Sequence, residues 1–174
     1  MNNFSRYWNA LTFVFSRHGD QKRISANIPY VIHPIRLTLI LRSNGFSEFE
    51  HGDLMIAALC HDLIEDTKTT FEEISKQFGE KVATIVNELS KPNDKSKEEW
   101  IKSFDKVSKE AKIIKMADRI DNLMDMPSST WTREKQIQYA QQGELILNYC
   151  GMANIKLAEL LKRTIRGILQ ENES

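Results

Sequence analysis

The segment that most restricts the fold is an apolar run over residues 54–60 that leads directly into a charged cluster. The run reads Leu-Met-Ile-Ala-Ala-Leu-Cys, and residues 61–66 then carry one imidazole and three carboxylates. Such groups are rarely buried unless they are paired or bind a metal. If the segment is helical, the side chains of His61 and Glu65 lie one turn apart on the same face. The segment therefore predicts a buried helix that ends in a metal site.

Apolar residues recur every three or four positions along most of the chain, as in amphipathic helices. The predicted helices cover residues 4–18, 34–41, 53–61, 70–78, 82–89, 96–104 and 108–126, and two more follow towards the C-terminus. Asp53 is the expected N-cap of the third helix, and capping boxes begin at Thr70 and Ser96. No stretch shows the alternation of a strand. The sequence thus predicts an all-α fold, with residues 1–174 as a single domain.

Composition narrows the class of protein and its partners. The chain of 174 residues balances 24 Lys and Arg against 24 Asp and Glu, which favours neither a nucleic-acid-binding nor a membrane-binding surface. The first residues lack the plan of a signal peptide, and no run approaches the ~18 apolar residues of a membrane span. Cys60 and Cys150 have neither metal-finger nor redox spacing, so we expect them to be core thiols. We therefore expect a soluble cytoplasmic protein.

Four residues are candidate metal ligands: His33, His61, Asp62 and Asp118. Singly, each has an ordinary explanation, since His33 could cap a helix and Asp118 could pair with Arg119 or a lysine. Together they offer nitrogen and oxygen but no sulfur. That donor set favours a hard or borderline divalent ion such as Mn, Fe, Mg or Zn.

Three motifs in this chain resemble those of a known family. They are Tyr30-Val-Ile-His33-Pro34, His61-Asp62-Leu-Ile-Glu65-Asp66-Thr67 and Lys115-Met-Ala-Asp118-Arg119-Ile-Asp-Asn122-Leu123. In this order, inside an all-helical chain, they resemble the HD superfamily of metal-dependent phosphohydrolases. More specifically, the chain as far as about Tyr149 is similar to the hydrolase domain of the RelA/SpoT homologues. That domain removes the 3′-pyrophosphate from guanosine tetra- and pentaphosphate, and the best match is the stand-alone small alarmone hydrolase.

The resemblance implies a fold and a set of roles. The expected fold is a single-domain HD-type helical bundle with a central metal site. His33, His61, Asp62 and Asp118 match the residues that hold one Mn²⁺ per chain. Glu65 and Asp66 match the acidic pair that positions or deprotonates the attacking water, which is consistent with general base chemistry beside a metal.

The same resemblance implies nucleotide contacts and leaves alternatives open. Arg23 matches the arginine that stacks on the base, Asn122 the asparagine at the sugar, and Tyr139 a tyrosine near the nucleotide. Ile24 stands where the family usually has a second basic residue. An adenosine alarmone such as pppApp, or another nucleotide phosphate ester, is therefore an alternative substrate. A nucleotide sensor without activity is a third reading, although all the predicted ligands and the acidic pair are present.

Overall fold

The structure is a computed structural model that describes residues 2–23, 27–126 and 131–170. Contacts between helices divide the chain into two compact units. The first comprises residues 1–22 and 28–92, and the second comprises residues 23–27 and 93–174. Over the described ranges every regular element is helical, apart from an isolated bridge between Lys22 and Pro29, so the all-α prediction is confirmed. The single domain stays a prediction.

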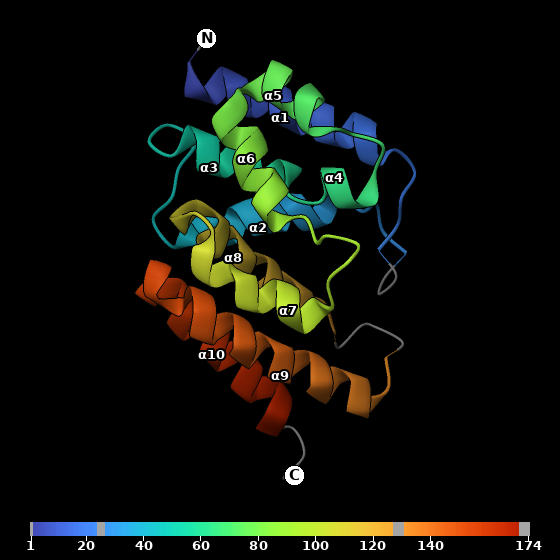
Figure 1. Cartoon of the computed structure of the whole chain (residues 1–174), viewed down its shortest axis with the longest axis vertical. Helices are drawn as coiled ribbons and strands as arrows, with labels where there is room; N and C mark the ends of the chain where they lie inside the picture. The colour runs from blue at the N-terminus through green and yellow to red at the C-terminus, as the bar shows by residue number, and fades with distance from the viewer. Residues whose placement is uncertain (1, 24–26, 127–130, 171–174) are drawn as a thin grey trace. The chain divides into compact units, whose positions relative to one another are not determined.

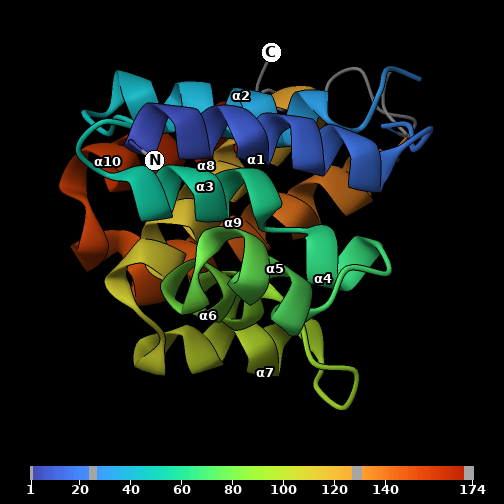
Figure 2. The same ribbon diagram turned by 90° about the horizontal axis from the view of Figure 1, so that it is seen from above.

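The first unit is organised around α3 (Gly52–Cys60), whose residues are all buried except Asp53. This helix contacts α1 (Asn3–His18), α2 (Ile32–Ser43) and α6 (Glu80–Leu89) (Figures 1 and 2). Its uniformly apolar sequence explains that central place, because each side of the helix faces a neighbour and none needs polar side chains. The chain then turns at His61 and Asp62 and enters the short α4 (Leu63–Asp66).

The termini of these helices follow local chemistry. The Asn2 side chain accepts a hydrogen bond from the Ser5 backbone N–H at 2.8 Å and caps α1. The predicted capping box at Thr70 is present at the start of α5 (Phe71–Phe78). Gly79, at φ +100°, joins α5 to α6 in the left-handed region that favours glycine.

The predicted N-cap at Asp53 is wrong. The helix begins one residue earlier, at Gly52, and its N-cap is His51. The Asp53 carboxylate lies in the first turn and accepts a hydrogen bond from the Arg6 guanidinium at 2.8 Å. A partner in another helix therefore holds Asp53, and it makes no cap.

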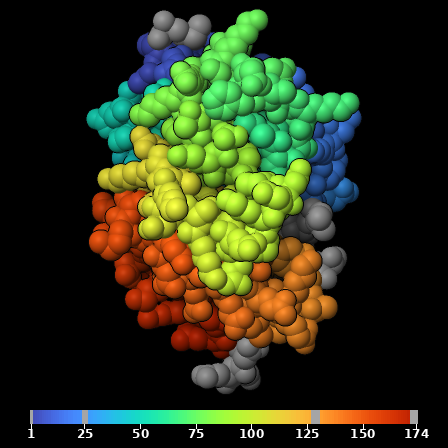
Figure 3. Space-filling model, viewed as in Figure 1, coloured from blue at the N-terminus to red at the C-terminus, as the bar shows by residue number. Residues whose placement is uncertain are grey.

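The second unit is built on α8 (Lys109–Asp125), which packs against α9 (Arg133–Cys150) and α10 (Ile155–Gln170). The 3-10 turn η3 (Gly151–Ala153) connects α9 to α10. The two helices approach closely at Gly143, where an added Cβ would meet the Ile165 side chain at 3.0 Å. The Ser96 capping box is also present, at the start of α7 (Lys97–Lys102), and η1 (Ser103–Lys106) follows. Figure 3 shows α7 lying along α9 on one face of this unit.

Two further sequence predictions are decided by burial and length. Cys60 and Cys150 are both buried and free, so the expectation of core thiols is confirmed. Burial raises the pKa of the Cys60 thiol far above its usual range and that of Cys150 to about 12. Within the ranges described, the helices are too short or too polar to cross a bilayer.

Candidate functional site

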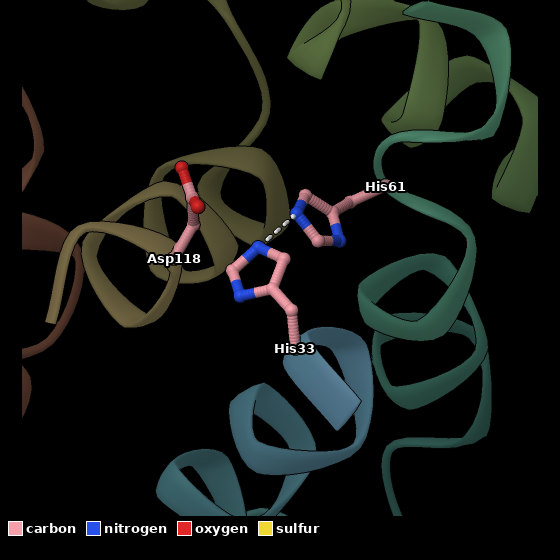
Figure 4. A group of neighbouring side chains, drawn as sticks. All are labelled: His33, His61 and Asp118. Carbon is pink, nitrogen blue, oxygen red and sulfur yellow. Dashed lines mark hydrogen bonds between the residues drawn. The ribbon is translucent and has the colours of Figure 1, made fainter. Parts of the chain in front are cut away.

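Two histidines of the first unit meet in its interior. His33 lies in the first turn of α2, and His61 directly follows α3. Both are at least 96% buried, and their Nε2 atoms are 3.2 Å apart (Figure 4). The Nδ1 atom of His61 lies 2.9 Å from the carbonyl oxygen of Ala58. Because a carbonyl only accepts hydrogen bonds, Nδ1 carries the proton of the neutral ring and Nε2 presents a lone pair.

Asp62 adds oxygen atoms to this pair. Its Oδ1 is 2.8 Å from Nε2 of His61, and its Oδ2 is 3.5 Å from Nε2 of His33. A ring-nitrogen lone pair and a carboxylate oxygen repel each other at this distance unless a proton or a cation lies between them. Adjacent ligands of an ion bound at about 2.1 Å are roughly 3 Å apart, so these donor atoms fit a divalent metal.

Tyr30 connects Asp62 to Asp66. The Tyr30 hydroxyl donates a hydrogen bond to Oδ2 of Asp62 at 2.6 Å and lies 3.2 Å from Oδ2 of Asp66. Partial burial of the Asp66 carboxyl group raises its pKa by desolvation, and the nearby negative charge of Asp62 raises this pKa further. Of the predicted acidic pair, Asp66 is thus the carboxylate that the structure brings to Asp62.

Glu65 has a different partner. Its Oε2 accepts a hydrogen bond from the backbone N–H of Lys91 at 3.0 Å, so the side chain anchors the segment after α6. The sequence did not suggest this contact, because it joins residues 26 positions apart. A catalytic role for Glu65 stays a prediction.

Asp118, the fourth predicted ligand, lies in the second unit, on α8, and is 6% exposed (Figure 4). Lys115 donates to its Oδ2 at 2.8 Å, and the Asn122 amide donates to its Oδ1. Lys115 is itself buried and lies 4.3 Å from the centroid of the Trp100 ring. Lysines on a helix usually extend to solvent, so the burial of Lys115 has no sign in the sequence.

Arg23 is held by the acidic side of the same helix. Its Nε and Nη2 atoms donate to Oδ2 of Asp125 at 3.1 and 3.0 Å, and Nη2 also donates to Oδ1 of Asn122 at 2.9 Å. Asp121 lies 3.9 Å from the same guanidinium. The structure therefore brings together two of the predicted nucleotide contacts, Arg23 and Asn122. Ile24 lies outside the described residues.

Tyr139, the third predicted nucleotide contact, is covered by cations. The Arg119 guanidinium carbon is 3.7 Å from the Tyr139 ring centroid, and the Lys97 ammonium is 5.0 Å from it. Arg119 is 1% exposed and also donates to the Tyr139 carbonyl at 3.2 Å. The Trp131 ring meets Tyr139 edge to face at 5.0 Å. These contacts give Tyr139 a packing role within the second unit, and its contact with a nucleotide stays a prediction.

Comparison with known proteins places these residues in a family context. A sequence model described as "HD domain" matches residues 10–154. The chain is 32% identical over 177 residues to guanosine-3′,5′-bis(diphosphate) 3′-pyrophosphohydrolase MESH1 of Drosophila melanogaster, which covers 95% of this chain and 97% of the fly protein. It is 30% identical over 161 residues to the protein of the same name from Danio rerio, covering 88% of both chains.

A solved structure gives the same result for the fold. It is described as a metazoan ortholog of SpoT that hydrolyzes ppGpp and plays a role in starvation responses. The match has a TM-score of 0.85 at 30% sequence identity, and it covers 94% of this chain and 95% of the other.

Proposed function

Because the chain belongs to the HD domain family, we propose that it is a guanosine-3′,5′-bis(diphosphate) 3′-pyrophosphohydrolase. The observation that carries this proposal is the convergence of His33, His61 and Asp62, whose donor atoms lie 2.8–3.5 Å apart in the first unit. Two buried imidazoles beside a half-buried carboxylate are suited to a divalent metal, and metal-assisted hydrolysis is the chemistry of phosphate ester cleavage.

The proposed metal is one Mn²⁺ per chain, held by His33, His61 and Asp62, with Asp118 as a fourth ligand. Support for Asp118 comes from its place in the third sequence motif and from the burial of its carboxylate. When bound, a divalent ion lowers the pKa of water and stabilises negative charge on phosphoryl oxygens. Lys115 and Asn122, which hold the Asp118 carboxylate, would fix its orientation.

The proposed reaction consumes one water and cleaves one phosphate ester bond. The water oxygen attacks the phosphorus attached to the 3′ oxygen, the bond between that oxygen and phosphorus breaks, and a proton ends on the 3′ oxygen. Pyrophosphate leaves, and GDP or GTP is the other product. Asp66 is the proposed acceptor of the water proton, because the Tyr30 hydroxyl joins its carboxylate to that of Asp62 at the proposed metal site. Glu65 is the proposed second member of the acidic pair.

Nucleotide recognition is proposed for Arg23, Asn122 and Tyr139. The hydrogen bonds from Arg23 to Asp125 and Asn122 use the edge of the guanidinium and hold its plane in one orientation. A fixed guanidinium plane is suited to stacking on a base, although stacking distinguishes purines weakly. The names of the relatives support a guanosine nucleotide as the proposed substrate. We propose this small molecule, and no nucleic acid, as the binding partner. A cytoplasmic location is likewise a proposal.

The test is product analysis with purified protein, Mn²⁺, and either ppGpp or pppApp, with the products separated by anion exchange. We expect pyrophosphate and GDP from ppGpp. Asp62→Asn should abolish release, whereas Asp105→Asn, at an exposed position in η1, should leave it unchanged. Preference for pppApp would replace guanosine by adenosine in the proposal. Tight binding of ppGpp without products from either nucleotide would identify a sensor.

A further inference from the structure

Tyr30 contacts several parts of the candidate site, but none of the predicted catalytic or binding roles includes it. Its backbone N–H donates to the carbonyl oxygen of Gln21 at 2.8 Å, next to the bridge between Lys22 and Pro29. Both contacts join Gln21 and Lys22 to the segment that leads into α2. The Gln21 side chain in turn donates to the backbone carbonyl of Asp66 at 2.9 Å. Tyr30 therefore lies where Gln21 contacts α4 within the first unit.

Two imidazoles fix the ring of Tyr30. The centroid of the His18 ring is 4.7 Å from that of Tyr30, and the His33 ring meets Tyr30 nearly edge-on at 5.7 Å. His18 is 3% exposed, and its Nδ1 lies 2.7 Å from Oε1 of Gln21. A ring packed in this way has little rotamer freedom, so its hydroxyl has a defined position.

The hydroxyl is shared by two carboxylates that have different predicted roles. A phenol has one proton, and the 2.6 Å contact to Asp62 has the length of a charge-assisted hydrogen bond. The 3.2 Å contact to Asp66 is longer, as expected for the second acceptor of one proton. One oxygen atom thus sets the positions of a proposed metal ligand and of the proposed base.

We propose that Tyr30 is a positioning residue for this reaction, whose hydroxyl orients Asp62 towards the two histidines and holds Asp66 beside it. This inference rests on the proposed function. Groups that orient metal ligands and bases typically change metal affinity or activity about 10- to 100-fold when they are lost.

The test compares Tyr30→Phe with Tyr7→Phe. Phenylalanine keeps the ring and removes only the hydroxyl. Tyr7 is a matched control, since its buried hydroxyl donates to Thr38 at 3.0 Å, outside the site but in the same unit. Four quantities are measured: the Kd of Mn²⁺ by equilibrium dialysis, kcat and KM for pyrophosphate release from ppGpp at saturating Mn²⁺, and the thermal unfolding midpoint.

For Tyr30→Phe we expect a roughly tenfold weaker Kd for Mn²⁺ and a kcat about 10- to 100-fold lower at saturating Mn²⁺, with little change in KM. The Tyr7→Phe variant should keep the wild-type Kd, kcat and KM, and the loss of its buried hydrogen bond should lower only the thermal unfolding midpoint. Wild-type Mn²⁺ affinity or wild-type kcat in Tyr30→Phe would overturn the proposal, because one hydroxyl would then not serve both carboxylates. If the wild type releases no pyrophosphate, the proposed function fails, and Mn²⁺ affinity alone still decides whether Tyr30 positions Asp62.

Discussion

Lys115 and Asp118 form a buried ion pair one turn apart on α8, with Nζ and Oδ2 2.8 Å from each other. A cation built into the chain thus neutralises the carboxylate that we propose as the fourth metal ligand. The Asp118 carboxylate would then contact two positive charges, the Lys115 ammonium and the bound metal ion.

Replacement of Lys115 by Met should therefore make folding depend on the metal. Without its partner, the buried Asp118 carboxylate is uncompensated, and the free energy of unfolding should fall by roughly 3–5 kcal/mol in metal-free protein. Mn²⁺ should recover more stability in Lys115→Met than in wild type. Urea unfolding with and without Mn²⁺ measures both effects. Lys102→Met is the control, since Lys102 pairs with Glu98 on the surface and should change neither measurement.

Removal of the metal should stop the reaction and weaken the fold. Dialysis against a chelator should abolish pyrophosphate release, and Mn²⁺ at a hundred times its Kd should raise the free energy of unfolding by about 2.7 kcal/mol. His61→Gln should lose most of this stabilisation, because it removes one imidazole ligand. His51→Gln, a change to a histidine that packs on Phe46 away from the site, should keep it. Equal stabilisation of both variants would exclude His61 as a ligand.

Glu65 can be tested for catalysis separately from its hydrogen bond to Lys91. Glu65→Gln keeps an oxygen acceptor for the Lys91 N–H but loses the basic carboxylate, whereas Glu65→Ala loses both. If Glu65 acts on the attacking water, kcat should fall about 100-fold or more in both variants. Steady-state rates with ppGpp give the answer. Full activity in Glu65→Gln together with a loss in Glu65→Ala would leave the residue only its anchoring role.

Arg23→Lys should weaken nucleotide binding although the charge is kept. Lysine cannot reproduce the two donors that Arg23 directs at Asp125, so the side chain loses its fixed plane. We expect KM for ppGpp to rise about tenfold, the effect of losing one hydrogen bond to a charged group. Arg17→Lys provides the control, because Arg17 pairs with Glu73 on the surface of the first unit. An unchanged KM in Arg23→Lys would argue against the proposed stacking.

The sequence predicted the helices well where local chemistry decides them. Capping boxes at Thr70 and Ser96 satisfy the first N–H groups of α5 and α7 with side chains only three residues away. Asp53 failed as a cap because Arg6, 47 positions away, binds its carboxylate. A cap is a local event, and a pattern in one segment carries no information about a partner in another.

In the candidate site, too, some features could be predicted from the sequence and others could not. His33, His61 and Asp62 could be selected from residue type and order, and the structure brings these three together in the first unit. Lys115 could not be recognised as buried, because lysines on a helix usually extend to solvent, and the sequence left open whether Asp118 pairs with Arg119 or a lysine or binds a metal. The role of Tyr30 depends on a hydroxyl lying between two carboxylates, a relationship that has no signature in the spacing of the residues.

The two buried cysteines have a practical consequence. Cys60 lies in the first unit and Cys150 in the second, and burial keeps both thiols protonated and away from solvent at neutral pH. Thiol-reactive dyes are electrophiles that only the thiolate attacks readily, so the native chain should remain unlabelled. One cysteine introduced at an exposed position of each unit would then take a donor and an acceptor dye without background. Energy transfer measured with and without ppGpp and Mn²⁺ would then report the distance between the two labelled positions in each state.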